Sequence, residues 1–87
     1  MAKKKLIGKI THYFTKIGVA VIELSDDIKI GDRIRIEGAT TSFEQVVDSM
    51  EIDNKKVETA TRGQSIGLKV KGRVRPPDSV YKLLETE

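Results

Sequence analysis

The chain has 87 residues and a formal net charge of +3 at pH 7, with 38% hydrophobic and 33% charged residues. This composition is typical of one globular domain and argues against a membrane-embedded or disordered chain. The absence of cysteine excludes disulfides and thiolate metal sites. No apolar segment of signal-peptide length follows the basic start, so we expect a cytoplasmic protein. We expect a single domain over residues 1–87, with residues 1–5 and 84–87 frayed.

The charges are distributed unevenly along the chain. Residues 1–16 hold five lysines and no acidic residue, residues 17–61 hold ten acidic and five basic residues, and residues 62–84 hold six basic residues and one acidic residue. Such an asymmetry says more about binding partners than the net charge does. Because protein surfaces are normally rich in lysine, solvated outer strand faces are an equal alternative.

Short β-branched and apolar runs separated by turn residues predict strands in the first half of the chain. The predicted strands are residues 6–14, 17–24, 28–30 and 33–37. In the first of them a change of parity indicates a bulge, which Gly8 could accommodate. Residues 33–37 alternate perfectly, so Ile34 and Ile36 are predicted to face the core.

The second half is predicted to contain further strands at residues 43–52, 55–60, 64–75 and 80–83. In residues 43–52 the apolar positions switch parity, which predicts a bulge near residues 46–49. Residues 64–75 have a two-residue period that separates an apolar row from a cationic row. The apolar row is Ile66, Leu68, Val70 and Val74, and the cationic row is Lys69, Lys71, Arg73 and Arg75.

No segment shows helical periodicity, and the strands recur at the spacing of a small barrel or sandwich. We predict an all-β fold, a small closed antiparallel β-barrel of about six strands. Closure would remove exposed sheet edges. If the first and last long strands are neighbours, the lysines of residues 3–16 and the cations of residues 62–75 form one patch.

Short motifs in residues 31–36, 47–50, 60–68 and 75–82 resemble the second domain of translational GTPases such as elongation factor Tu. The last motif is also similar to stand-alone elongation-factor-like small proteins and to the C-terminal barrel of some collagenase-like peptidases. The resemblance covers about residues 6–83 and implies the closed barrel of translation-protein domain II type. In the GTPases this domain contacts transfer RNA or the ribosome, so the resemblance implies transfer or ribosomal RNA, or a ribonucleoprotein, as partner.

Few side chains could carry catalysis. His12 is the only histidine, and beside Tyr13 and Phe14 we interpret it as a structural or surface residue rather than a metal ligand. Asp26 and Asp27 diverge in a polar turn and are interpreted as solvated. No phosphate-binding Gly-x-x-x-x-Gly-Lys-Ser/Thr run exists, which excludes GTP hydrolysis by this chain alone. We therefore predict that the protein is not an enzyme and binds no metal or other cofactor.

The cationic row is the main functional candidate. Its residues would lie about 6.5–7 Å apart along one strand face, which is comparable to the phosphate spacing of a single strand. Tyr13 and Tyr81 are the only expected base-stacking residues. The predicted nucleic-acid-binding residues are Lys69, Lys71, Arg73, Arg75, Arg62, Lys3, Lys4, Lys5, Tyr13 and Tyr81.

Our first hypothesis is a non-catalytic barrel that binds RNA or a ribonucleoprotein through this basic face, without contact to a membrane. The alternative is a protein-interaction or accessory module that binds no nucleic acid. The sequence offers no constellation of residues for a small ligand.

Overall fold

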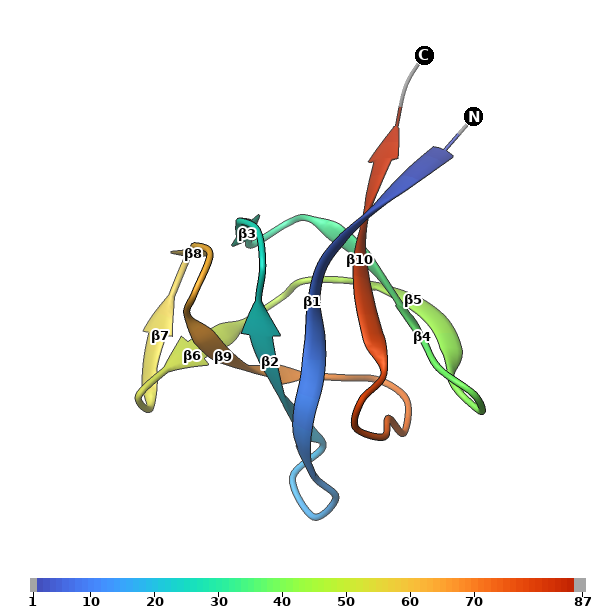
Figure 1. Ribbon diagram of the computed structural model, residues 1–87. Helices are drawn as coiled ribbons and strands as arrows, with labels where there is room; N and C mark the ends of the chain where they lie inside the picture. The colour runs from blue at the N-terminus through green and yellow to red at the C-terminus, as the bar shows by residue number, and fades with distance from the viewer. Residues whose placement is uncertain (1, 86–87) are drawn as a thin grey trace.

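The computed structural model describes residues 2–85, which form ten strands and no helix (Figure 1). The strands are β1 (Ala2–Phe14), β2 (Val19–Leu24), β3 (Ile28–Lys29), β4 (Arg33–Glu37), β5 (Ser42–Val46), β6 (Met50–Ile52), β7 (Lys55–Val57), β8 (Thr59–Ala60), β9 (Ser65–Lys69) and β10 (Ser79–Glu85). The all-β prediction is confirmed. No helix in residues 2–85 could cross a membrane.

Eight strands form one antiparallel sheet in the order β5-β4-β10-β1-β2-β9-β6-β7, and β3 pairs with β8 in a second, two-stranded sheet. The chain ends lie side by side because Ala2 pairs with Glu85 at the end of the β1–β10 ribbon. Figure 1 shows this ribbon extending beyond the remaining strands. Residues 2–5 and 84–85, which we expected to fray, are therefore paired, while residues 1, 86 and 87 lie outside the described range.

Strand β1 pairs with β10 on one side and with β2 on the other, and each pairing contains a bulge. Its register with β10 shifts between Leu6 and Gly8, and its register with β2 shifts between Ile10 and His12. The bulge predicted near Gly8 is confirmed. Because each bulge inserts one residue, both Ile7 and Ile10 can point into the core, where they are 0% and 1% exposed.

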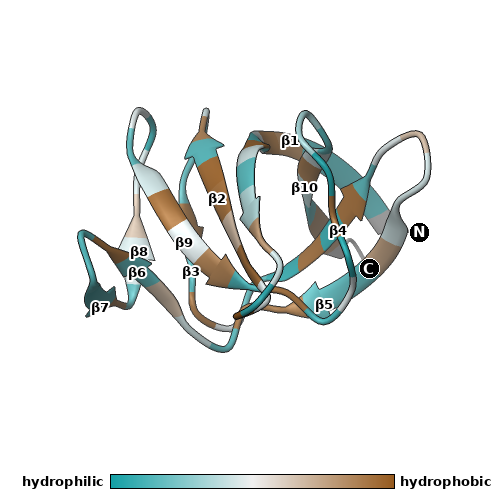
Figure 2. Ribbon diagram, turned by 90° about the horizontal axis from the view of Figure 1, so that it is seen from below, coloured by the Kyte–Doolittle hydropathy of each residue, from teal (hydrophilic) through white to brown (hydrophobic). Residues whose placement is uncertain are grey.

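The core lies on one face of the curved sheet. It contains sixteen buried apolar residues: Ile7, Ile10, Ala20, Ile22, Leu24, Ile28, Ile34, Ile36, Val47, Met50, Ala60, Ile66, Leu68, Val70, Val74 and Val80. The inward orientation predicted for Ile34 and Ile36 is confirmed. Figure 2 shows hydrophobic bands alternating with paler ones along β9, as expected for a strand with one face toward the core.

The predicted strand over residues 43–52 is wrong. The structure divides it into β5, which pairs with β4, and β6, which pairs with β9 and β7 near the other end of the sheet. Val47 lies between them, and its backbone exchanges hydrogen bonds with Gly31 and Asp32. The switch of parity therefore marks a passage across the core rather than a bulge within one strand.

The predicted strand over residues 64–75 is too long, because β9 ends at Lys69. Beyond that point the backbone finds no strand partner: the Val70 N–H donates to Gly18 O and the Lys71 N–H donates to the Gln45 side chain. Val70 and Val74 are still buried. The two-residue period therefore reports burial correctly over a segment that forms no sheet ladder.

Candidate functional site

The predicted nucleic-acid-binding residues do not form one site. Strand β2 lies between β1 and β9, so the expected adjacency of the first and last long basic strands is wrong. The side chains of the cationic row are exposed and make no ion pair or hydrogen bond within residues 2–85. Arg62 and Lys3 are exposed as well. Tyr13 packs against the core, which leaves little of its ring for stacking.

Lys4 is used within the fold. Its Nζ lies 2.6 Å from Glu37 Oε2 and 4.6 Å from the centre of the Tyr81 ring. The structure thus brings two predicted site residues together, on the outer face of β1 and β10. There they form an internal cation–π contact and ion pair instead of an open binding surface.

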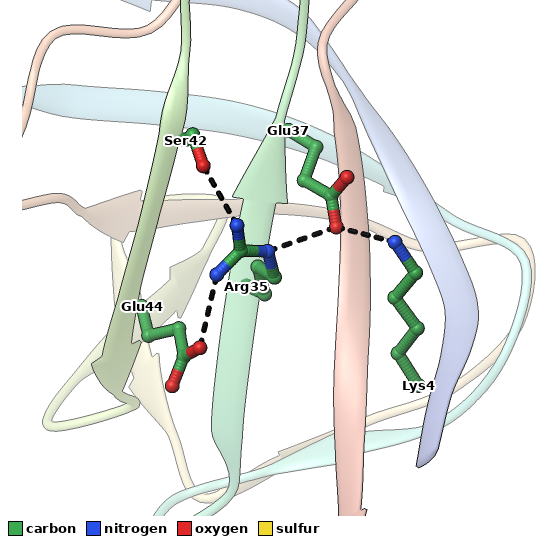
Figure 3. Close-up of polar contacts among 5 residues, drawn as sticks. All are labelled: Lys4, Arg35, Glu37, Ser42 and Glu44. Atoms are coloured by element: carbon green, nitrogen blue, oxygen red, sulfur yellow. Dashed lines mark hydrogen bonds and ion pairs between the residues drawn. The ribbon is translucent and has the colours of Figure 1, made fainter. Parts of the chain in front are cut away.

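Arg35 extends this network across β4 and β5 (Figure 3). Its Nε lies 2.9 Å from Glu37 Oε2, its Nη1 2.9 Å from Glu44 Oε2, and its Nη2 2.7 Å from Ser42 Oγ. Hydrogen bonding and charge from Lys4, followed by Arg35, hold the pKa of Glu37 below its usual value. Sequence reasoning missed this network because it depends on strand register, which alternation alone does not specify.

A second set of pairs lies where the β1–β10 ribbon leaves the sheet. Lys5 Nζ is 2.5 Å from Asp26 Oδ2, and Lys82 Nζ is 3.4 Å from Asp32 Oδ2. The hydrogen bond from Lys5, together with one from the Asp27 N–H, lowers the pKa of Asp26. Asp26 is therefore a partner in an ion pair rather than a purely solvated turn residue.

The outer side of β1, β2 and β9 is different, because apolar residues there remain partly or largely exposed. We call His12, Phe14, Val19, Val21 and Gly67 the hairpin face. Strand register places Phe14 opposite Val19, and places Val21 opposite both His12 and Gly67. The Phe14 side chain is 46% exposed. Its ring lies edge-on to the ring of His12, and the two ring centroids are 4.4 Å apart. Ile17, in the turn that joins β1 to β2, is 62% exposed.

An open groove of about 700 Å³ lies elsewhere on the molecule, lined by residues of β3, β6, β7 and β8 and their connections. Its lining mixes both charges, including Lys29, Lys56, Asp48 and Glu58. No group of three or more His, Cys, Asp or Glu residues that could hold a metal ion occurs in residues 2–85. The groove therefore offers no convergent set of ligands for a metal.

Comparisons with known proteins return peptidases. An uncharacterized protease of Methanocaldococcus jannaschii is 47% identical over 85 residues, which are 97% of this chain and 21% of that protein. A collagenase of Porphyromonas gingivalis is 40% identical over 87 residues, which are 98% of this chain and 24% of that protein. The chain thus spans only about a fifth to a quarter of these relatives. No protein-family model matches it.

Two solved structures share the fold of this chain. The C-terminal domain of a Geobacillus thermoleovorans protein assigned to the U32 peptidases superposes with a TM-score of 0.84 at 21% identity, covering 90% of this chain and 91% of that domain. Its selenomethionine variant gives a TM-score of 0.83 at 20% identity. This likeness concerns the fold.

These findings correct three expectations. The resemblance to translational GTPases is wrong, because the similar proteins are named protease, collagenase and U32 peptidase. The RNA-binding function inferred from it is wrong for the same reason. The expectation that the protein is not an enzyme is also corrected, because the relatives are named protease and collagenase, of which this chain matches 21% and 24%. The motif at Gly31-Asp32 is a poor guide to the family, because the geometry of a turn is enough to explain it. Gly31 has a φ of 95°, a backbone conformation that favours glycine in any similar turn.

Proposed function

We propose that this chain is an accessory β-domain of a U32-type peptidase. In this proposal the domain binds polypeptide and so supports the activity of the whole peptidase. The observation that supports this most directly is the 47% identity to a protease over 97% of the chain. The match to a C-terminal domain of nearly equal extent supports the same architecture. The partner that follows is a polypeptide, either a substrate or another part of the peptidase.

The distribution of contacts supports binding by a surface. Lys4 and Lys5 on β1, Arg35 on β4 and Lys82 on β10 form ion pairs within the protein. The hairpin face and the cationic row, in contrast, combine exposed apolar side chains with charges that have no partner in residues 2–85. An exposed apolar surface of this kind is typical of a protein–protein contact.

We also propose that the sheet closes into a small barrel at the edge of β5. The Gln45 Nε2 donates to Lys69 O at 2.9 Å, and Gln45 Oε1 accepts from the Lys71 N–H at 2.8 Å. A side-chain amide here takes the place of a strand ladder between β5 and the end of β9. Gly72 supports the same approach, since a Cβ there would lie 2.9 Å from the Phe43 ring. For the compartment we propose the cytoplasm, which the lack of cysteine supports.

The Porphyromonas gingivalis collagenase allows a direct test. Three forms are compared: the intact protein, a form without the segment that matches this chain, and a form with this chain grafted in its place. If the domain binds polypeptide, deletion raises the KM for collagen with little change in kcat, and the graft restores the KM. A deletion that lowers kcat at unchanged KM, or that changes neither constant, contradicts the proposal.

A further inference from the structure

The hairpin face is a partly apolar surface on the outer side of β1, β2 and β9. Residues opposite one another on antiparallel strands project from the same side, so one row is His12, Val21, Gly67 and Glu51, and the next row is Phe14, Val19 and Lys69. Val19 and Val21 are only partly covered. The solvent-facing side of β1 and β2 therefore carries apolar residues, Phe14, Val19 and Val21, where polar ones are usual.

Position 67 contributes no side chain to the row between Val21 and Glu51, and we call this gap in the row the depression. A Cβ built at Gly67 would meet only Val19 Cγ1 at 3.4 Å and Glu51 O at 4.0 Å. The fold therefore does not require glycine at this position through crowding, in contrast to Gly8, where a Cβ would lie 2.7 Å from a backbone oxygen. A side chain from another molecule can occupy the space above Gly67.

The charge around this depression is polarised. Lys69 lies opposite Val19, and the hydrogen bond from the Val70 N–H to Gly18 O, at 2.9 Å, joins the end of β9 to the turn that carries Lys16. Lys16, Lys69 and Lys71 are exposed and have no ion pair within residues 2–85. Glu23 lies across from Ser65, toward the other end of the face, and Glu51 lies across from Gly67, directly beside the depression. The rim beside the β1–β2 turn is therefore purely cationic.

We propose that the hairpin face docks an acidic polypeptide segment, which places one aromatic or aliphatic side chain over Gly67 and its carboxylates against Lys16, Lys69 and Lys71. This rests on the proposed function of the chain as a polypeptide-binding module and names the surface and the chemistry of its partner. A second copy of this chain is a poorer occupant, because each copy carries a net charge of +3. Apolar insertion supplies affinity, and the cationic rim sets orientation and association rate.

The test uses the whole chain and a short fluorescent peptide with one phenylalanine and an acidic block on one side of it only. Fluorescence anisotropy should detect binding that weakens with added salt. Gly67→Val fills the depression and should weaken binding by about tenfold, as should replacing the phenylalanine of the peptide by serine. Lys69→Glu should weaken binding by a similar factor, whereas Lys29→Glu, an equal change of charge on β3, should leave it unchanged.

Several outcomes overturn the inference. Equal binding by Gly67→Val and the unmutated chain, with both folded by circular dichroism, would show that the depression is not used. Equal loss in Lys29→Glu, or full competition by inorganic polyphosphate at matched charge, would reduce the interaction to unspecific anion binding. If sedimentation shows that the chain self-associates through this face, the occupant is a second copy of the chain. Each of these results leaves the collagenase graft experiment unaffected, so failure of this surface and failure of the accessory-domain function are separable.

Discussion

At the scale of single residues, two polar side chains connect segments that the backbone hydrogen bonds of the sheet do not connect. Gln45 is 7% exposed and connects β5 to the backbone on both sides of Val70. Arg35 joins the outer faces of β4 and β5 and shares Glu37 with Lys4. Gln45 is expected to contribute more to the free energy of unfolding than Arg35, because a buried backbone group without a partner costs far more than a solvated ion pair contributes.

Gln45→Leu should therefore destabilise the protein. The substitution keeps the volume of the side chain but leaves the Lys69 carbonyl and the Lys71 N–H without their partner, at an expected cost of about 2 kcal/mol. Urea unfolding followed by circular dichroism measures the change. Gln64→Leu is the matched control, since Gln64 is exposed and its side chain accepts hydrogen bonds only from Thr61, within its own turn. Equal midpoints for Gln45→Leu and the unmutated protein would remove Gln45 as the closing element.

At the scale of elements, much of the fold could be predicted from alternation alone. The orientation of Ile34 and Ile36, the bulge at Gly8 and the burial of Val70 and Val74 all follow from local pattern. Local pattern works here because each strand buries one face, which fixes the parity of its apolar residues.

Pairing partners and ladder ends could not be predicted in this way. The break between β5 and β6 depends on Val47 bonding to Gly31 and Asp32, which are distant in sequence. The end of β9 depends on where β2 begins, at Val19. The candidate surface was hidden for the same reason: the sequence identified Lys69 as a basic position, but only strand register places it beside Val19 and Phe14.

The first bulge of β1 makes a specific prediction about Gly8. A Cβ there would lie 2.7 Å from Glu23 O and 2.9 Å from Ile22 Cγ2, so the backbones of β1 and β2 would have to separate. Gly8→Ala should therefore cost about 1–3 kcal/mol in the free energy of unfolding. Gly67→Ala is the same change in β9, where a Cβ would make only ordinary contacts, and it should stay within about 0.5 kcal/mol of the unmutated protein. Similar thermal midpoints for both variants would contradict the close approach at Gly8.

At the scale of the whole molecule, the chain ends are part of one ribbon. Ala2 pairs with Glu85, and β1 is enclosed between β10 and β2. The first and last strands of the sequence are therefore neighbours in the sheet. If the chain ends are connected there, the order of the strands in the sheet does not depend on where the chain is opened. The turn at Asp53 and Asn54, with φ values of 51° and 65°, connects the edge strand β7 to β6 and is exposed.

This arrangement predicts that a circular permutant folds. Joining the ends of the β1–β10 ribbon by a short flexible linker and opening the chain between Asp53 and Asn54 should preserve all ladders except the turn between β6 and β7. Cooperative urea unfolding and peptide binding by the hairpin face should both persist. Opening the chain between Ile22 and Glu23 is the control, because that cut lies in β2, which is paired on both sides, and it should prevent cooperative folding. A permutant opened at Asp53 that fails to fold would contradict the pairing of β1 with β10.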